Sequence, residues 1–245
     1  MKKIVFMLCV IVIAASNGHA DSRSNTYKWS QLPDLSITGR DIGATEPTVL
    51  ADDWECLNGL PITDIHWWGS YLGWEEANPT PDTFSAPHPD AFNFSMHTDV
   101  PLPNQFGYSF PGQLINGAQA LQGQYTVELI GTIDKGGIFE HVFQYNFDLT
   151  DPWFQQQGLI YWLDISASYN DPIGNFLWGW HTAKTQWNDS AVIAIPGAAP
   201  GWIPIEPTGE KVDLAFELST VPEPGVMILF GFGIIGWFVR RRNRM

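Results

Sequence analysis

The sequence predicts an all-β fold, a two-sheet antiparallel sandwich of jelly-roll type between an N-terminal signal peptide and a short C-terminal transmembrane helix. Three observations support this fold class. Apolar and polar residues alternate with a period of two in several runs, helical periodicity is hard to find, and no βαβ pattern occurs. About 200 residues remain between the two end segments, which is enough for one all-β domain.

Four runs alternate most clearly, and each places its apolar side chains on one face of a strand. The run from 139 to 149, for example, puts Phe139, Phe143 and Phe147 on one face and Glu140 and Asp148 on the other. The other three runs are 92–96, 161–167 and 212–218. Five further strands are expected at 47–52, 62–68, 124–132, 175–181 and 191–195. Turn clusters at 134–137 and 170–172 separate some of these runs, so we predict about nine strands.

The first twenty residues predict a secretory signal peptide. Lys2 and Lys3 precede an unbroken apolar run from residue 4 to residue 15, and small residues follow at Gly18 and Ala20. The run is shorter than the ~20 residues that a bilayer span needs. We therefore expect signal peptidase to cut between Ala20 and Asp21.

The C-terminus has three consecutive parts. Residues 221–224 form a proline-containing motif, residues 225–239 are apolar, and a basic cluster closes the chain. The motif consists of Val221, Pro222, Glu223 and Pro224, and the cluster consists of Arg240, Arg241, Arg242 and Arg244. The apolar part would give about 22 Å of helix against a bilayer core of ~30 Å, and the arginines would stop it on the cytoplasmic side. The alternative is a permanent single-span anchor.

Charge excludes several classes of partner for the segment between the two ends. Residues 21–223 carry six basic and 26 acidic residues, a net charge of −20. No basic stripe exists for nucleic acid, and anionic lipid headgroups are excluded for the same reason.

Cys56 is the only cysteine of this segment, so it forms no disulfide within it, and we expect its thiol to be buried and inert.

Tryptophans are the unusual feature of the body. The candidate glycan-binding residues are Trp67, Trp68, Trp74, Trp178 and Trp180, with Asp64 as a hydrogen-bonding partner. Indoles can stack on the apolar faces of sugar rings if they are exposed. Adjacent tryptophans on a strand point to opposite faces, so one of Trp67 and Trp68 leaves the core unless another segment covers it. The alternative interpretation is that the tryptophans fill the core of the sandwich.

No catalytic motif is present, and we predict no enzymatic activity, no metal site and no cofactor. The histidines are scattered without metal-ligand spacing. An enzyme alternative is a glycosidase, in which Asp64 and Asp164 would supply the two carboxyl groups. Acidic loops such as residues 78–90 offer a second alternative, a structural Ca²⁺ held by carboxylates and carbonyls.

The C-terminal motif, apolar segment and arginine cluster resemble the PEP-CTERM sorting signal in order and spacing. The resemblance implies that exosortase, a membrane protease or transpeptidase, reads Pro222, Glu223 and Pro224 and removes the tail. It also implies a Gram-negative bacterium that makes exopolysaccharide. Segments of the body between residues 28 and 195, such as 62–70 and 187–192, resemble an uncharacterised domain common in PEP-CTERM proteins. That second resemblance implies no activity.

These inferences predict four parts: a signal peptide at 1–20, a β-sandwich at 21–200, a last strand and linker at 201–220, and a sorting signal at 221–245. The expected protein passes through the inner membrane and reaches the cell-envelope surface or the extracellular matrix. Its expected role is structural or binding, with exopolysaccharide as a candidate partner.

Overall fold

The computed structural model describes residues 26–71, 73–74, 86–170, 176–197, 199–206 and 210–220. The predicted signal peptide with its Ala20–Asp21 cleavage site, the motif at 221–224 and the terminal arginines lie outside the described residues. Within the described residues, no helix is both long enough and apolar enough to cross a membrane.

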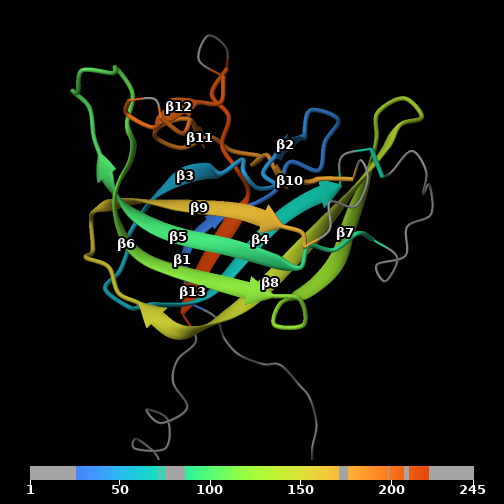
Figure 1. The fold of residues 1–245 in the computed structure, drawn as a ribbon, viewed down its shortest axis with the longest axis horizontal. Helices are drawn as coiled ribbons and strands as arrows, with labels where there is room; N and C mark the ends of the chain where they lie inside the picture. The colour runs from blue at the N-terminus through green and yellow to red at the C-terminus, as the bar shows by residue number, and fades with distance from the viewer. Residues whose placement is uncertain are drawn as a thin grey trace, which may run out of the picture.

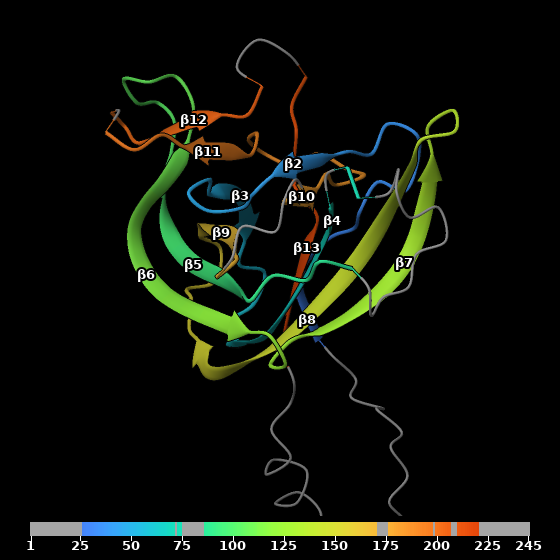
Figure 2. The same cartoon turned by 45° about the vertical axis from the view of Figure 1, so that its right-hand side comes forward.

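The described part of the chain forms thirteen strands in two antiparallel sheets (Figure 1). The first sheet has seven strands: β1 (Thr26–Gln31), β2 (Asp41–Gly43), β4 (Ile62–Tyr71), β7 (Thr126–Asp134), β8 (Phe139–Trp153), β10 (Trp178–His181) and β13 (Phe216–Thr220). The second sheet has six strands: β3 (Leu50–Glu55), β5 (Ala91–Val100), β6 (Phe110–Leu121), β9 (Ile160–Ser168), β11 (Val192–Ala194) and β12 (Trp202–Pro204). Figure 2 shows the sheets as two layers, with β5 and β6 in one and β7 and β8 in the other.

The strand order is that of a jelly roll with additions. One sheet contains the order β2-β10-β4-β8 and the other contains β3-β9-β5-β6. From β2 to β5 successive strands alternate between the sheets, and β5 and β6 form a hairpin. From β8 to β10 the alternation resumes. The predicted two-sheet antiparallel sandwich of jelly-roll type is therefore confirmed, with β7, the β1-β13 pair and the β11-β12 pair added to it.

Aromatic side chains from both sheets fill the space between them. Trp67 of β4 stacks on Tyr145 of β8 at a centroid distance of 5.4 Å. Across the sandwich its indole meets Phe92 and Phe94 of β5 edge-on at 4.9 and 4.8 Å. Trp178 of β10 meets Phe92 at 4.9 Å. Such contacts follow from the period-two alternation, because every second residue of each strand faces the opposite sheet.

All nine predicted strands overlap observed strands, but four observed strands were not predicted. Three of them, β1, β2 and β12, are six residues or shorter. The fourth, β6, is twelve residues long and contains Pro111, Gly112 and Gly117. It lies at the edge of its sheet, and most of its side chains are exposed or half-buried, so it has no sustained apolar alternation.

Candidate functional site

All five candidate tryptophans are buried, with exposed fractions of 0–4%. The expectation that they present exposed ring faces is therefore wrong, and the core-filling interpretation holds for Trp67, Trp74, Trp178 and Trp180. Trp67 and Trp178 occupy the space between the sheets, Trp180 donates a hydrogen bond to the carbonyl of Ala215 at 2.8 Å, and Trp74 packs edge-on against Tyr71. These tryptophans are buried because they either fill the space between the two sheets or are covered by neighbouring segments of the chain.

Trp68 differs from the other four because it lies on the outer face of its sheet. Since Trp67 faces the core, the next residue of β4 faces outward, where Trp68 packs against Ile133, Val142 and Ala215. Its indole lines a groove of about 510 Å³. Four of the other lining residues are apolar, namely Leu32, Pro33, Leu35 and Ile130, and four are polar, namely Asp34, Ser36, Gln144 and Lys184.

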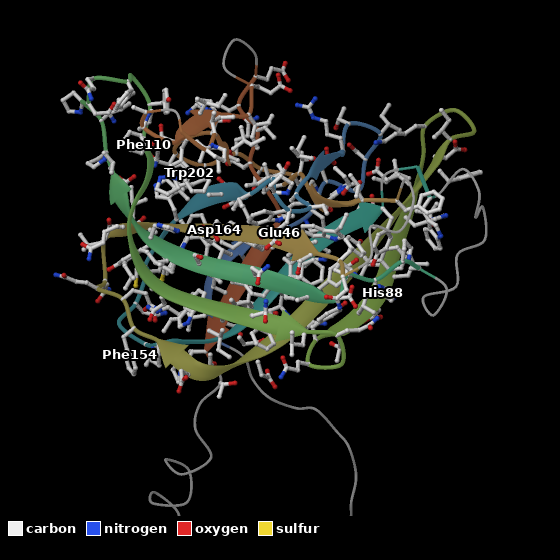
Figure 3. All side chains as sticks on the ribbon, viewed as in Figure 1. Glu46, His88, Phe110, Phe154, Asp164 and Trp202 are labelled. Carbon is white, nitrogen blue, oxygen red and sulfur yellow. The ribbon has the colours of Figure 1, made fainter. Side chains whose placement is uncertain are left out.

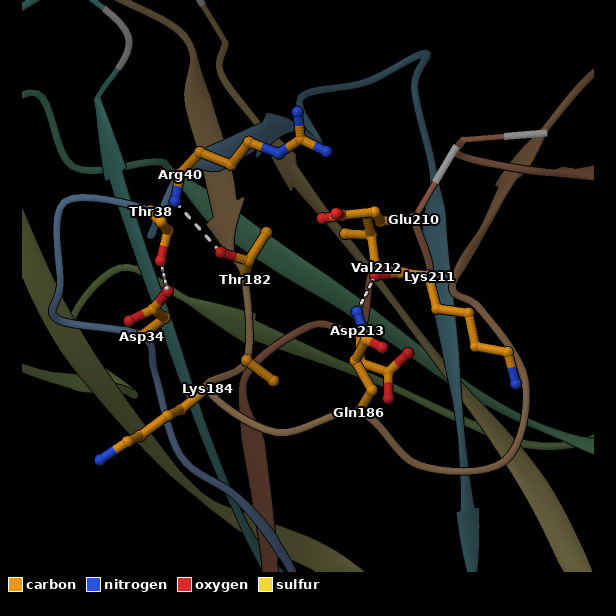
Figure 4. A pocket seen from close by; sticks show the side chains of 11 residues that line it. Asp34, Thr38, Arg40, Thr182, Lys184, Gln186, Glu210, Lys211, Val212 and Asp213 are labelled. Atoms are coloured by element: carbon orange, nitrogen blue, oxygen red, sulfur yellow. Dashed lines mark hydrogen bonds between the residues drawn. The ribbon is translucent and has the colours of Figure 1, made fainter. Parts of the chain in front are cut away.

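Figure 4 shows a polar pocket next to this groove. Its volume is about 610 Å³, and it adjoins the groove because Asp34 and Lys184 line both. Thr38 donates a hydrogen bond to the carboxylate of Asp34 at 2.7 Å, and the backbone N–H of Arg40 donates to the hydroxyl of Thr182 at 3.1 Å. The remaining lining residues are Ala183, Gln186, Glu210, Lys211, Val212 and Asp213. The apolar groove and the polar pocket together form one amphipathic depression, which we call the Trp68 groove.

The structure does not bring Asp64 and Asp164 together. Asp64 lies on β4 of one sheet, where its carboxylate contacts His66 Nε2 at 2.9 Å and accepts a hydrogen bond from Ser219 at 3.0 Å. Asp164 lies on β9 of the other sheet (Figure 3), 2.9 Å from His97 Nε2. Ile65 and Leu163, their sequence neighbours, face the core, so both carboxylates point outward from opposite sheets. The two therefore cannot flank one glycosidic bond, and the pairing suggested by the sequence is wrong.

Each of these two carboxylates instead contacts a histidine and shifts the pKa of its imidazole. Burial lowers the pKa of His66 and of His97, but the hydrogen bond and negative charge of the partner aspartate outweigh it, and the net pKa of each histidine is raised. Asp64 and Asp164 are thus structural partners of the two imidazoles in this fold.

A second group of carboxyls is buried where the loop at 187–189 packs against β3. Burial, followed by the negative charges of Asp213 and Asp53, raises the pKa of Asp52 well above its usual range. Burial raises the pKa of Asp53 to about 8 and that of Asp213 to about 7, although hydrogen bonds from the Asn188 side chain and the Trp187 backbone oppose these two shifts.

A third cluster joins residues far apart in the sequence. Asp41 of β2 and His181 of β10 are direct partners in the sheet register, and their side chains meet with that of Glu140, near the start of β8. One ligand atom from each of the three lies within 4.8 Å of the other two. Burial and then the negative charge of Asp41 raise the pKa of Glu140 to about 7, against the effect of Lys135. Their spacing of 99 and 41 residues gives no sequence signal, which is why sequence reasoning missed them.

The expectation that Cys56 is buried is confirmed. Its thiol is fully buried and free, and it contacts the ammonium group of Lys28 at 3.8 Å. The loop offered for Ca²⁺, residues 78–90, lies largely outside the described residues.

Two family models match the chain. A search among curated proteins finds no significant match. The PEP-CTERM protein-sorting motif matches residues 220–242, which indicates a protein that is exported to the cell envelope and processed by exosortase. A domain of unknown function (DUF7901) matches residues 27–219, a range that begins in β1 and ends in β13. The chain therefore belongs to the DUF7901 family and carries a PEP-CTERM sorting motif at its C-terminal end.

Proposed function

We propose that this protein is a cell-surface or extracellular-matrix binding protein that holds a neutral glycan in the Trp68 groove. The proposal includes removal of residues 1–20 by signal peptidase and of the tail beyond residue 220 by exosortase. The body would then face exopolysaccharide outside the cell. The sorting motif supports export and processing, and the groove supports binding.

The observation that carries the proposal is the division of the depression into an apolar and a polar half. A sugar ring has apolar C–H faces and a rim of hydroxyls, so it needs apolar surface beside hydrogen-bonding groups. Leu32, Leu35 and Ile130 supply the apolar surface, while Arg40 and Gln186 supply donors on the polar side. Trp68 adds its indole ring, which lines the groove although the residue is only 3% exposed.

Charge also favours a neutral ligand. The segment between the two end signals has a net charge of −20, which disfavours polyanionic glycans over most of the surface. The depression itself holds Arg40, Lys184 and Lys211 beside Asp34, Glu210 and Asp213. Charges of both signs suit a ligand with many hydroxyls and no net charge.

The test is a polysaccharide panel probed with the domain from Asp21 to Thr220. Tryptophan fluorescence and released reducing sugar are followed together. We expect a saturable fluorescence change without sugar release. Sugar release would instead indicate a hydrolase, and no response to any neutral glycan would leave a purely structural protein.

Two matched leucine variants locate the binding surface. Leu35 lines the groove and is 46% exposed, whereas Leu57 is 53% exposed and does not line it. We expect Leu35→Ala to weaken glycan binding about five- to tenfold through lost apolar contact, and Leu57→Ala to leave it unchanged. Equal affinity of both variants would place the binding surface elsewhere.

A further inference from the structure

The cluster of Asp41, Glu140 and His181 has the geometry of a metal site. His181 Nδ1 lies 3.0 Å from Asp41 Oδ1 and 3.4 Å from Glu140 Oε1. A metal ion bonded at about 2.1 Å to two donors holds them about 3.0 Å apart at a right angle and about 3.4 Å apart at a tetrahedral angle. The two separations from His181 Nδ1 are thus those of a coordination sphere, and all three donor atoms lie within 4.8 Å of one another.

Each of the three residues is also held by a partner at its other polar atom. His181 Nε2 donates to the backbone carbonyl of Asp34 at 2.9 Å, which leaves Nδ1 as the atom that faces the two carboxylates. Ser70 donates its hydroxyl to Asp41 Oδ2, and Lys135 donates to Glu140 Oε2 at 2.6 Å. Outer partners of this kind fix the orientation and tautomer of metal ligands in proteins.

Gly39 makes possible the hydrogen bond from His181 Nε2 to the backbone carbonyl of Asp34. A Cβ atom at Gly39 would lie 1.8 Å from the carbonyl oxygen of Asp34 and 3.0 Å from His181 Nε2. Any larger residue would therefore displace the carbonyl that orients the imidazole. This loop backbone approaches His181 closely because residue 39 has no side chain.

The three side chains of the cluster are largely buried. The side chains of His181 and Asp41 are 0% and 1% exposed, and that of Glu140 is 15% exposed. Glu140 Oε1 is buried and lies 3.4 Å from His181 Nδ1, farther than a well-formed hydrogen bond. Two buried carboxylates that face one imidazole repel each other, and a bound cation would offset that repulsion.

We propose that Asp41, Glu140 and His181 bind a divalent transition metal ion of the Zn²⁺ type. One imidazole nitrogen with two carboxylate oxygens is a borderline donor set, which suits Zn²⁺ and its first-row neighbours. Ca²⁺ prefers six to eight oxygen ligands, so it is disfavoured by the imidazole and by the small number of side chains. The ion would join β2 and β10 to β8 within the first sheet.

The test uses the full-length chain, purified in detergent and stripped with EDTA. The chain is dialysed against micromolar ZnCl₂, and its metal content and melting temperature are measured. We expect one Zn²⁺ per chain and a higher melting temperature. Co²⁺ in place of Zn²⁺ should give visible absorption bands. No retained Zn²⁺, or retention of Ca²⁺ in preference to Zn²⁺, would overturn the proposal.

Single substitutions test whether the Zn²⁺ ion binds at Glu140 and His181. Glu140→Gln and His181→Gln each remove one ligand and should weaken Zn²⁺ binding at least about tenfold, since loss of an outer partner alone can cost that much. The controls are Glu128→Gln on neighbouring β7 and His66→Gln, another histidine paired with an aspartate. Unchanged Zn²⁺ affinity in Glu140→Gln, with the fold verified by circular dichroism, would refute the site even if His181→Gln fails to fold. Glycan binding is measured separately, so the two proposals fail independently.

Discussion

Asp53 of β3 accepts a hydrogen bond from the side-chain amide of Asn188, a residue 135 positions further along the chain. Asp53 is 1% exposed, and its second oxygen, Oδ1, has no hydrogen-bond partner among the described residues. Burial raises the pKa of this carboxyl to about 8; the Asn188 hydrogen bond opposes the shift, and the charges of Asp189, Asp213 and Asp99 add to it. The folded protein therefore keeps a proton on Asp53 at neutral pH.

We predict that the free energy of unfolding falls as pH rises from about 4 to about 8. In the unfolded chain Asp53 and Asp213 lose their protons near 3.8, whereas the folded state holds them up to about 8 and about 7. The folded state thus binds more protons across this window, and stability decreases with pH. The raised pKa values of His66 and His97 act in the same direction above pH 6.5. Urea unfolding at pH 5 and pH 8 measures the difference, and greater stability at pH 8 would contradict it.

Asp53→Asn should flatten this pH dependence. An amide keeps an acceptor for Asn188 and needs no proton, so we expect the variant to gain on the order of a few kcal/mol more at pH 8 than at pH 5. Asp151→Asn, which changes an exposed carboxyl on β8, is the matched control. Parallel stability curves for wild type and Asp53→Asn would show that Asp53 does not titrate in this window.

Gly69→Ala should destabilise the domain by about 1–3 kcal/mol or more, because it overpacks the core. A Cβ atom at Gly69 would lie 2.3 Å from the carbonyl oxygen of Gly179 and 2.5 Å from the buried ring of Trp178. Gly117→Ala on the exposed edge strand β6 is the control, since its Cβ meets nothing closer than 3.6 Å. Thermal unfolding of both variants measures the effect, and equal melting temperatures would argue against the close approach of β4 and β10.

Lys28→Met should cost about 2–4 kcal/mol of stability. Lys28 is fully buried on β1, and its ammonium group donates to the carbonyl oxygens of Asn58 at 2.8 Å and of Leu60. Methionine keeps most of the volume but leaves these acceptors without their donor. Lys184→Met, at an exposed lysine, should change the unfolding free energy by less than about 0.5 kcal/mol. A neutral effect of Lys28→Met would mean that water replaces the ammonium.

Cys56 should not react with a thiol reagent in the folded protein. Its side chain is fully buried, and its sulfur lies 2.9 Å from the carbonyl oxygen of Asn58, so attack requires unfolding. We expect labelling rates to follow the urea unfolding curve. Rapid labelling in native buffer would indicate local opening between β3 and β4.

The local patterns predicted much of the fold, but they could not show which outward strand faces other segments cover. Alternation placed strands at 139–149 and 161–167, and both were found. It could not show that Trp68, on the outward face of β4, is covered by Ile133 and Val142, because cover comes from other segments. It also missed β6, since an edge strand exposes both faces and needs no apolar alternation.

By itself the sequence determined that this protein is an all-β sandwich with a sorting motif at its C-terminal end, because strand periodicity and the motif at 221–224 are local properties of consecutive residues. Only the tertiary structure decided which side chains meet. Asp64 and Asp164 were separated because their strands belong to different sheets, and Asp41, Glu140 and His181 were brought together because β2 pairs with β10 in the sheet that also contains β8. Long-range strand pairing sets these distances, and no spacing along the chain encodes them.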